Sequence, residues 1–294
     1  MFFCLLIALL TLVGNNQLVL TGARYGLMLW YHDVLPLLLP FMILSNLFVL
    51  RLRRQKNPGK HAIAVLFLLG LLCGYPLGAK IAADFTKESM LDKRLATILL
   101  PMCNNVSPMF LSGYICHLVL KNRYSFLFIL AMLYIPYICV TVLCLIINYR
   151  RFNTRQVNHA RNTSITNPAM QTQITADTIL LQSIIQITYV GLYIMLCSIL
   201  VSLVTSIPGL SQNAATVFCG LLEVTQGTKA LAESVFSHAI KTALILACTS
   251  FGGISAILQT KQVLQKSGLS LFYYIVMKLV CACITGCLTY LLLI

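Results

Sequence analysis

The chain has 294 residues, of which 59% are hydrophobic and only 10% are charged, and its mean hydropathy is +0.88. This composition excludes an ordinary water-soluble domain, whose surface needs far more charge. The formal net charge of +14 does not indicate a nucleic-acid partner, because eighteen of the 21 lysines and arginines lie between apolar stretches or at their ends. Positive charge in such places fixes the orientation of membrane proteins.

Nine apolar segments follow one another along the chain, and most have the roughly 20 residues that a helix needs to cross a hydrocarbon core about 30 Å thick. We therefore expect an all-α integral membrane protein. The first segment lacks the basic start and the cleavage site of a signal peptide, so we expect residues 1–22 to form an extra N-terminal membrane segment. The segments cover residues 2–20, 26–50, 62–83, 95–120, 126–149, 178–206, 216–236, 242–259 and 271–293.

Two motifs recur in the two halves of the chain, in the same order. The pattern G-x-K-x-x-A-[DE] occurs at Gly78–Asp84 and again 149 residues later at Gly227–Glu233. Further on, Asn104–Phe110 aligns with Gly252–Leu258 at an offset of 148 residues. Chance similarity between apolar segments is the alternative explanation. Internal repeats are typical of secondary transporters, whose substrate site lies between the repeats near the middle of the bilayer.

The distribution of positive charge favours a topology in which two of the nine segments do not cross. If all nine crossed, the eighteen charges would divide equally between the two sides, contrary to the positive-inside rule. If the third and seventh segments are re-entrant hairpins, fourteen charges are cytoplasmic and four are outside. Each repeat, residues 26–149 and 177–294, then consists of a span, a re-entrant hairpin and two further spans. Because three spans per repeat is an odd number of crossings, the second repeat has the opposite orientation in the membrane. The polar residues 150–176 become a cytoplasmic linker.

Residues unsuited to a continuous helix occur at matching places in both repeats. Gly74–Gly78 holds a proline between two glycines and should turn the first hairpin, and Thr225–Gly227 is the expected turn of the second. In the spans that follow, Asn104–Pro108 and Thr249–Gly253 should unwind the helix. Broken backbone at membrane depth is tolerated only where it is buried in protein or lines a wet cavity. We therefore expect four breaks to meet near the bilayer midplane.

These breaks are the predicted substrate site, because helix N-termini there offer unpaired N–H groups and a positive dipole end that suit an anionic solute. Lys80 and Lys229 are candidate positive charges, with ion pairs to Asp84 and Glu233 or snorkelling toward headgroups as alternatives. Glu223 is a candidate ligand for substrate or coupling ion, with a structural hydrogen bond as the alternative. The expected substrate-binding residues are Gly74, Tyr75, Pro76, Gly78, Lys80, Asn104, Asn105, Ser107, Glu223, Thr225, Gly227, Lys229, Ser250, Gly252, Gly253 and Gln259.

No motif indicates catalysis, so we expect neither enzymatic activity nor a cofactor. The five histidines are scattered, and the chain has no H-E-x-x-H motif, no G-x-S-x-G motif and no phosphate-binding loop. The twelve cysteines fall in apolar segments without metal-ligand spacing; Cys281, Cys283 and Cys287 come nearest to it. We expect these cysteines to pack between helices and to bind no metal.

Four blocks of sequence resemble, in order, the bacterial sporulation integral membrane protein YlbJ family, also called stage V sporulation protein V, within the nucleoside-recognition Gate domain group. They are GYPLGAK (Gly74–Lys80), NNVSPMF (Asn104–Phe110), LEVTQG (Leu222–Gly227) and SFGGISAILQ (Ser250–Gln259). The family is similar to concentrative nucleoside transporters, so the resemblance implies two inverted repeats, each with a re-entrant hairpin and an unwound helix. It also implies transport of dipicolinic acid from the mother cell toward the forespore, across a membrane that surrounds the forespore.

Together these patterns predict a multi-pass membrane transporter for a small polar, anionic solute, with dipicolinic acid as the solute that the resemblance implies. The expected partners are this solute and the lipid bilayer, with no nucleic acid; a coupling ion and a homo-oligomer stay open. The alternatives are a non-transporting membrane scaffold or assembly factor for the spore envelope, and a transporter for a nucleoside-type solute.

Overall fold

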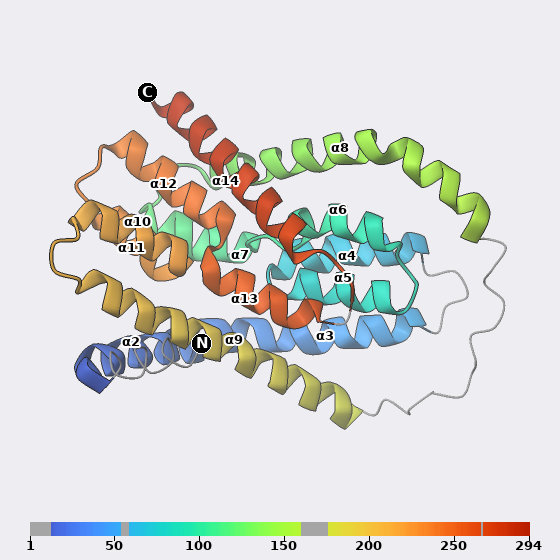
Figure 1. The fold of residues 1–294 in the computed structure, drawn as a ribbon, viewed down its shortest axis with the longest axis horizontal. Coiled ribbons are helices and arrows are strands. Elements are labelled where there is room, and N and C mark those ends of the chain that lie inside the picture. The colour runs from blue at the N-terminus through green and yellow to red at the C-terminus, as the bar shows by residue number, and fades with distance from the viewer. Residues whose placement is uncertain (1–12, 54–58, 160–175, 266) are drawn as a thin grey trace.

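The computed structural model describes residues 13–53, 59–159, 176–265 and 267–294, and every regular element in these ranges is a helix (Figure 1). This confirms the expected all-α class. Five helices in these ranges are long and apolar enough to cross a membrane. Asn16–Val34 together with Leu38–Leu44, which are bent by 54° relative to each other, form a sixth candidate span. The five are Lys93–Val119, Phe126–Asn148, Asp177–Thr205, His238–Leu264 and Leu271–Leu293. The chain is therefore a multi-pass membrane protein.

The N-terminal helices differ from the prediction, which placed a break between residues 20 and 26. Helix α2 (Asn16–Leu29) runs through this region without interruption. It continues through the π-helical turn η1 (Trp30–Val34) into α3 (Leu35–Arg53). Residues 1–12, most of the expected extra N-terminal segment, lie outside the described residues.

Two glycines explain why the predicted break is wrong. Gly22 and Gly26 of α2 face α9 (Ala176–Thr205), and an added Cβ would lie 2.7 Å from the Cα atoms of Ile199 and Met195, respectively. Small residues four positions apart let two helices approach closely in a membrane. These glycines therefore mark a helix contact and not a loop.

Two pairs of short helices form hairpins, which lie at opposite ends of the molecule in Figure 1. The first is α4 (Gly59–Cys73) with α5 (Leu77–Lys87), and the second is α10 (Gln212–Leu222) with α11 (Val224–Glu233). Helices of 10 or 11 residues, such as α5, α10 and α11, extend only about 16 Å, roughly half of the hydrocarbon core. The third and seventh apolar segments are thus helix–turn–helix units, and their re-entry into the membrane stays a prediction.

The turn of the first hairpin lies where we expected it, but the turn of the second lies earlier. Helix α11 already begins at Val224, so Thr225–Gly227 is helical and the chain turns at Glu223. The Glu223 carboxylate accepts a hydrogen bond from the backbone N–H of Gln226 (2.8 Å) and caps α11. An added Cβ at Gly227 would overlap the backbone of Gly220, so this glycine serves close packing of α10 on α11.

Each hairpin is followed by a broken helix. In the first half, α6 (Lys93–Cys103) ends at an irregular stretch, residues 104–107, and the chain resumes as α7 (Pro108–Phe110) and the π-helical η2 (Leu111–Val119). In the second half, α12 (His238–Phe251) and α13 (Gly253–Leu264) are separated by Gly252, whose φ is +85°. Both predicted unwound regions are confirmed, although Thr249 and Ser250 stay helical.

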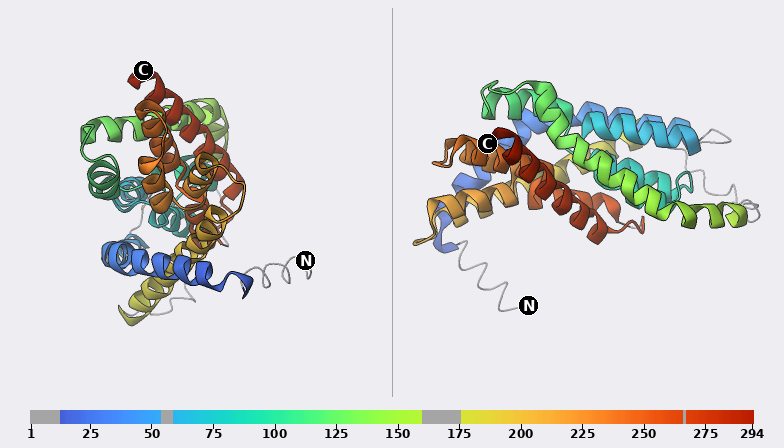
Figure 2. Two further views of the ribbon diagram at one scale, coloured as in Figure 1. Left: turned by 90° about the vertical axis from the view of Figure 1, so that its left-hand side faces the viewer. Right: turned by 90° about the horizontal axis from the view of Figure 1, so that it is seen from above.

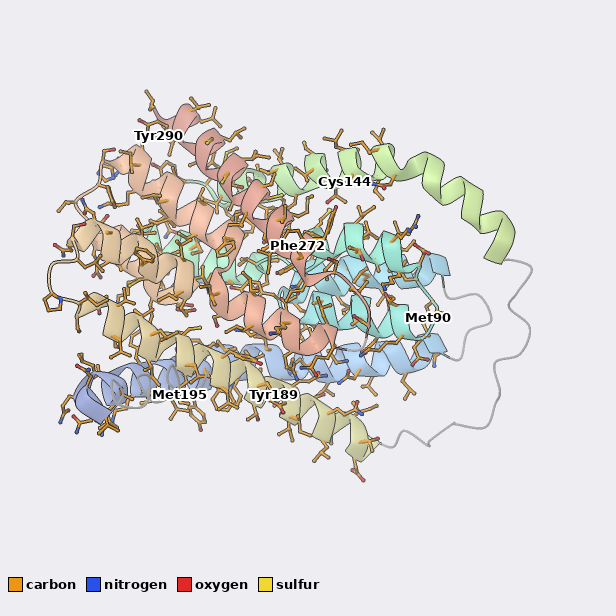
Figure 3. All side chains as sticks on the ribbon, viewed as in Figure 1. Met90, Cys144, Tyr189, Met195, Phe272 and Tyr290 are labelled. Carbon is orange, nitrogen blue, oxygen red and sulfur yellow. The ribbon has the colours of Figure 1, made fainter. Side chains whose placement is uncertain are left out.

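Long apolar helices cover the outside of the bundle. They are α8 (Phe126–His159), α9 and α14 (Leu271–Leu293), and α8 and α14 lie side by side (Figure 2). The aromatic side chains of Tyr189, Phe272 and Tyr290, labelled in Figure 3, are exposed together with many leucines and isoleucines of the same helices. Such surfaces suit contact with lipid. Helix α8 includes residues 150–159 of the predicted linker, and residues 160–175 lie outside the described residues.

Candidate functional site

A cavity of about 480 Å³ lies where the hairpin turns meet the broken helices. This volume is within the range of sites for small molecules. Seven of the predicted substrate-binding residues line it: Gly74, Tyr75, Ser107, Glu223, Thr225, Gly252 and Gln259. All four predicted breaks contribute to this set, which also includes Glu223 at the turn before α11 and Gln259 on α13. Residues of both halves of the chain therefore line one cavity.

Close contacts hold the first hairpin turn against both breaks. The backbone N–H of Tyr75 donates to the carbonyl oxygen of Asn105 (3.0 Å). An added Cβ at Gly74, whose φ is +75°, would lie 2.8 Å from the backbone nitrogen of Ser107, and one at Gly252 would lie 3.4 Å from the ring of Tyr75. Gly74 thus allows the first turn to lie against the first break, and Gly252 of the second break lies in van der Waals contact with Tyr75 of the first turn.

The second hairpin turn brings a buried carboxylate to the cavity. Glu223 is only 3% exposed and lines the wall, while one of its carboxylate oxygens caps α11. The neighbouring turn is held by Tyr114, whose hydroxyl donates to the carbonyl oxygen of Thr225 (2.8 Å). An added Cβ at Gly253 would lie 3.0 Å from the carbonyl oxygen of Leu222, which seats this turn on the second break.

Two further ionisable residues line the cavity and were not predicted. His32 and Asp33 belong to η1 and stand beside Tyr114 in the lining. Asp33 is an acidic residue inside the second apolar segment, and this position could have identified it from the sequence. An ionisable residue at membrane depth is a functional candidate by default. Among the described lining residues no lysine or arginine occurs. The cavity wall therefore carries two carboxylates and no permanent positive side chain.

The two motif lysines do not reach the cavity. Lys80 is buried in the first hairpin, where its Nζ lies 2.7 Å from Asp84 Oδ2 and also donates to Asn46 Oδ1. The ion-pair alternative therefore applies to Lys80. Lys229 and Glu233 are both exposed on α11.

Other predicted residues hold the elements together behind the cavity. The Asn104 side chain accepts from the backbone N–H of Ala79 (3.0 Å) and donates to the hydroxyls of Thr260 (2.9 Å) and Tyr274 (3.0 Å). An added Cβ at Gly78 would overlap the carbonyl oxygen of Cys103. Like Gly78 and Asn104, the residues Pro76, Asn105, Gly227, Ser250 and Gly253 are buried without lining the cavity.

Lys278 is the buried charge that the sequence reasoning missed. It lies on α14 and is fully buried. Its Nζ donates to Asn105 Oδ1 (3.1 Å) and stands 5.1 Å from the centre of the Tyr137 ring. A single lysine eight residues into an apolar segment was the available signal.

The described residues contain no group of three or more histidine, cysteine or acidic side chains placed to hold a metal ion. Of the cysteines that the sequence singled out, Cys281 is buried and both Cys283 and Cys287 are exposed on α14. All three are free thiols, and they face helices or the outer surface rather than the cavity.

These features define a class: a multi-pass helical membrane protein with broken helices around a central, mainly apolar cavity that carries a few polar and ionisable side chains. Over 317 aligned positions the chain is 22% identical to the sporulation integral membrane protein YlbJ of Bacillus subtilis (strain 168). The alignment covers 90% of this chain and 75% of that protein. No protein-family model and no solved structure matches the chain. The similarity supports the resemblance to the YlbJ family and agrees with a membrane protein.

Proposed function

We propose that the chain is a membrane transporter for a small polar solute, which binds in the central cavity. The observation that supports this most is the meeting of two hairpin turns and two broken helices around one cavity. Irregular backbone at membrane depth is expected where it lines a substrate pathway. A scaffold would not need a cavity enclosed by all four breaks.

Alternating access follows if the two hairpins are re-entrant and the two halves form an inverted repeat. The short helices of both hairpins and the asymmetric distribution of positive charge support this topology. Each half then contributes one hairpin and one broken helix to the solute-binding site. Rocking of one half against the other would open the cavity to each side in turn.

The family resemblance implies dipicolinic acid as the solute and a forespore-surrounding membrane as the location. The N-termini of α5 and α11 point their positive dipole ends toward the turns and favour an anionic group. Asp33 and Glu223 oppose a dianion, however, and Lys80 and Lys229 lie away from the cavity. This lining favours the second candidate, a nucleoside-type solute that offers hydrogen-bond donors to Glu223.

Uptake into proteoliposomes tests both candidates with radiolabelled dipicolinate and radiolabelled uridine. We expect saturable uptake of one of them. Uridine uptake should fall about tenfold or more in Glu223→Gln, because hydrogen bonds to a charged group contribute about 1.5–3 kcal/mol, whereas uptake of the dipicolinate dianion, which Glu223 opposes, should not fall. The amide oxygen of glutamine still caps α11, so folding should survive. Lys229→Ala is the matched control, since Lys229 is exposed on the same helix, and it should transport normally.

The identity of the labelled solute decides between the candidates. Dipicolinate uptake would support the solute implied by the resemblance, and uridine uptake would support the nucleoside-type alternative. Absence of uptake of both by folded protein would contradict the transport proposal and favour the scaffold.

A further inference from the structure

The C-terminal end of the half-helix α6 is a place where transporters of this architecture coordinate a cation. Unwound carbonyls and the negative dipole end of a half-helix bind Na⁺ in such proteins. Here α6 ends at Cys103, and the carbonyl groups of residues 104–106 are released from the helix. These carbonyl oxygens therefore need hydrogen-bond donors or a cation.

Protein donors satisfy all three carbonyls. The carbonyl oxygen of Asn104 accepts from the Tyr274 hydroxyl (3.3 Å), and that of Asn105 accepts from the backbone N–H of Tyr75 (3.0 Å). The carbonyl oxygen of Val106 accepts from the Tyr134 hydroxyl (2.7 Å). Protein hydrogen bonds therefore hold the three carbonyls of the first break, whereas the buried Asn105 Nδ2 has no hydrogen-bond partner.

The side-chain nitrogen of the buried Lys278 lies in this network. Asn105 Oδ1 accepts both from Lys278 Nζ (3.1 Å) and from the backbone N–H of Val106 (2.9 Å). The face of the Tyr137 ring lies on the other side of the ammonium, at 5.1 Å, and aromatic faces attract cations. Among the described residues no carboxylate lies within 4.0 Å of Lys278 Nζ. The ammonium is thus held by neutral acceptors, as a bound monovalent cation would be.

At the second break, hydroxyl groups bond to Ser250, and no lysine takes part in these hydrogen bonds. The carbonyl oxygen of Ser250, at the end of α12, accepts from the Tyr137 hydroxyl (2.8 Å). The hydroxyls of Thr285 and Ser250 lie 3.5 Å apart. Tyr137 therefore contacts both networks, with its ring at Lys278 and its hydroxyl at Ser250. Lys278 and Thr285 both come from α14, so this helix supplies donors to both halves.

We propose that the Lys278 ammonium is the resident cation of the first break and takes the place of an inorganic coupling cation there. Because the charge is covalently attached to α14, it cannot leave with the solute. A sodium gradient then does not drive transport through this break. This inference rests on the proposed transport function. The test of the inference measures thermal unfolding and needs no solute.

The test compares thermal unfolding of the purified protein in NaCl and in N-methyl-D-glucamine chloride at equal ionic strength. Wild type should unfold at the same Tm in both salts. Lys278→Ala removes the ammonium and opens space at Asn105, so its Tm should be lower in N-methyl-D-glucamine and should rise saturably by several degrees with Na⁺. Lys278→Met fills the space without charge and should show no difference between the salts.

Each result decides the question. A specific, saturable Na⁺ stabilisation of wild type would overturn the proposal, as would a Lys278→Ala variant whose Tm is equal in both salts. Recovery of folded Lys278→Ala only in Na⁺ supports it, and failure to recover this variant in either salt contradicts it. Lys229→Ala, which removes an exposed lysine, controls for the change in net charge. No solute is added in this experiment, so its outcome does not depend on the outcome of the uptake experiment.

Discussion

The two broken helices reach the same cavity by different chemistry. The first break is several residues long and is held by side chains: Asn104 alone bonds a backbone N–H and two hydroxyls, and Lys278 holds Asn105. The second break has two successive glycines in the left-handed region, Gly252 at φ +85° and Gly253 at φ +78°. The comparison teaches that an unwound helix can be stabilised by buried polar partners or by backbone freedom, and the two halves should therefore fail under different substitutions.

The largest effect should follow Gly78→Ala in the first half. The added methyl group overlaps the Cys103 carbonyl, and both groups belong to packed helices that cannot move independently. We expect little or no folded protein, measured by size-exclusion profile after purification. Gly113→Ala is the matched control, because nothing lies within 4 Å of its added Cβ. A well-folded Gly78→Ala variant would show that α5 does not pack on α6 as described.

A smaller difference should separate Asn104→Ala from Ser250→Ala. Removing the Asn104 side chain leaves the buried N–H of Ala79 and two hydroxyls without this partner, which should cost about 3 kcal/mol. Ser250→Ala keeps the backbone carbonyl that Tyr137 uses and should cost less than about 1 kcal/mol. Thermal unfolding of the two purified variants measures the difference. Equal losses of stability would contradict the distinction between the breaks.

Substitution of the motif lysines should have smaller effects than Asn104→Ala, and the effects at the two lysines should be unequal. Lys80→Met leaves the partly buried Asp84 without its partner and should cost about 2 kcal/mol. The double variant Lys80→Met, Asp84→Leu should recover part of that loss, which separates the ion pair from packing. Lys229→Ala should leave the Tm unchanged, because the side chain is exposed. A matching loss in both single variants would show that the two lysines play equivalent roles.

Much of the fold could be predicted because lipid imposes simple rules on sequence. Apolar length identified the helices, and the Gly74–Pro76 turn and the unwound regions near Asn105 and Gly252 were visible as residues that cannot continue a helix. The same rule misled at Gly227, since a glycine that breaks a helix and a glycine that lets two helices touch look alike in sequence. Only the partner helix distinguishes them.

The sequence by itself indicated a helical membrane protein with two hairpin segments and two interrupted helices, because backbone at membrane depth has few permitted forms. The tertiary structure showed that seven of the sixteen predicted site residues line one cavity. The tertiary structure alone decided which charges face that cavity. It paired Lys80 with Asp84, left Lys229 exposed, placed Asp33 and Glu223 in the lining of one cavity and buried Lys278 against Asn105. The environment of an ionisable side chain depends on helices distant in the chain, and no local pattern records which of them will be its neighbours.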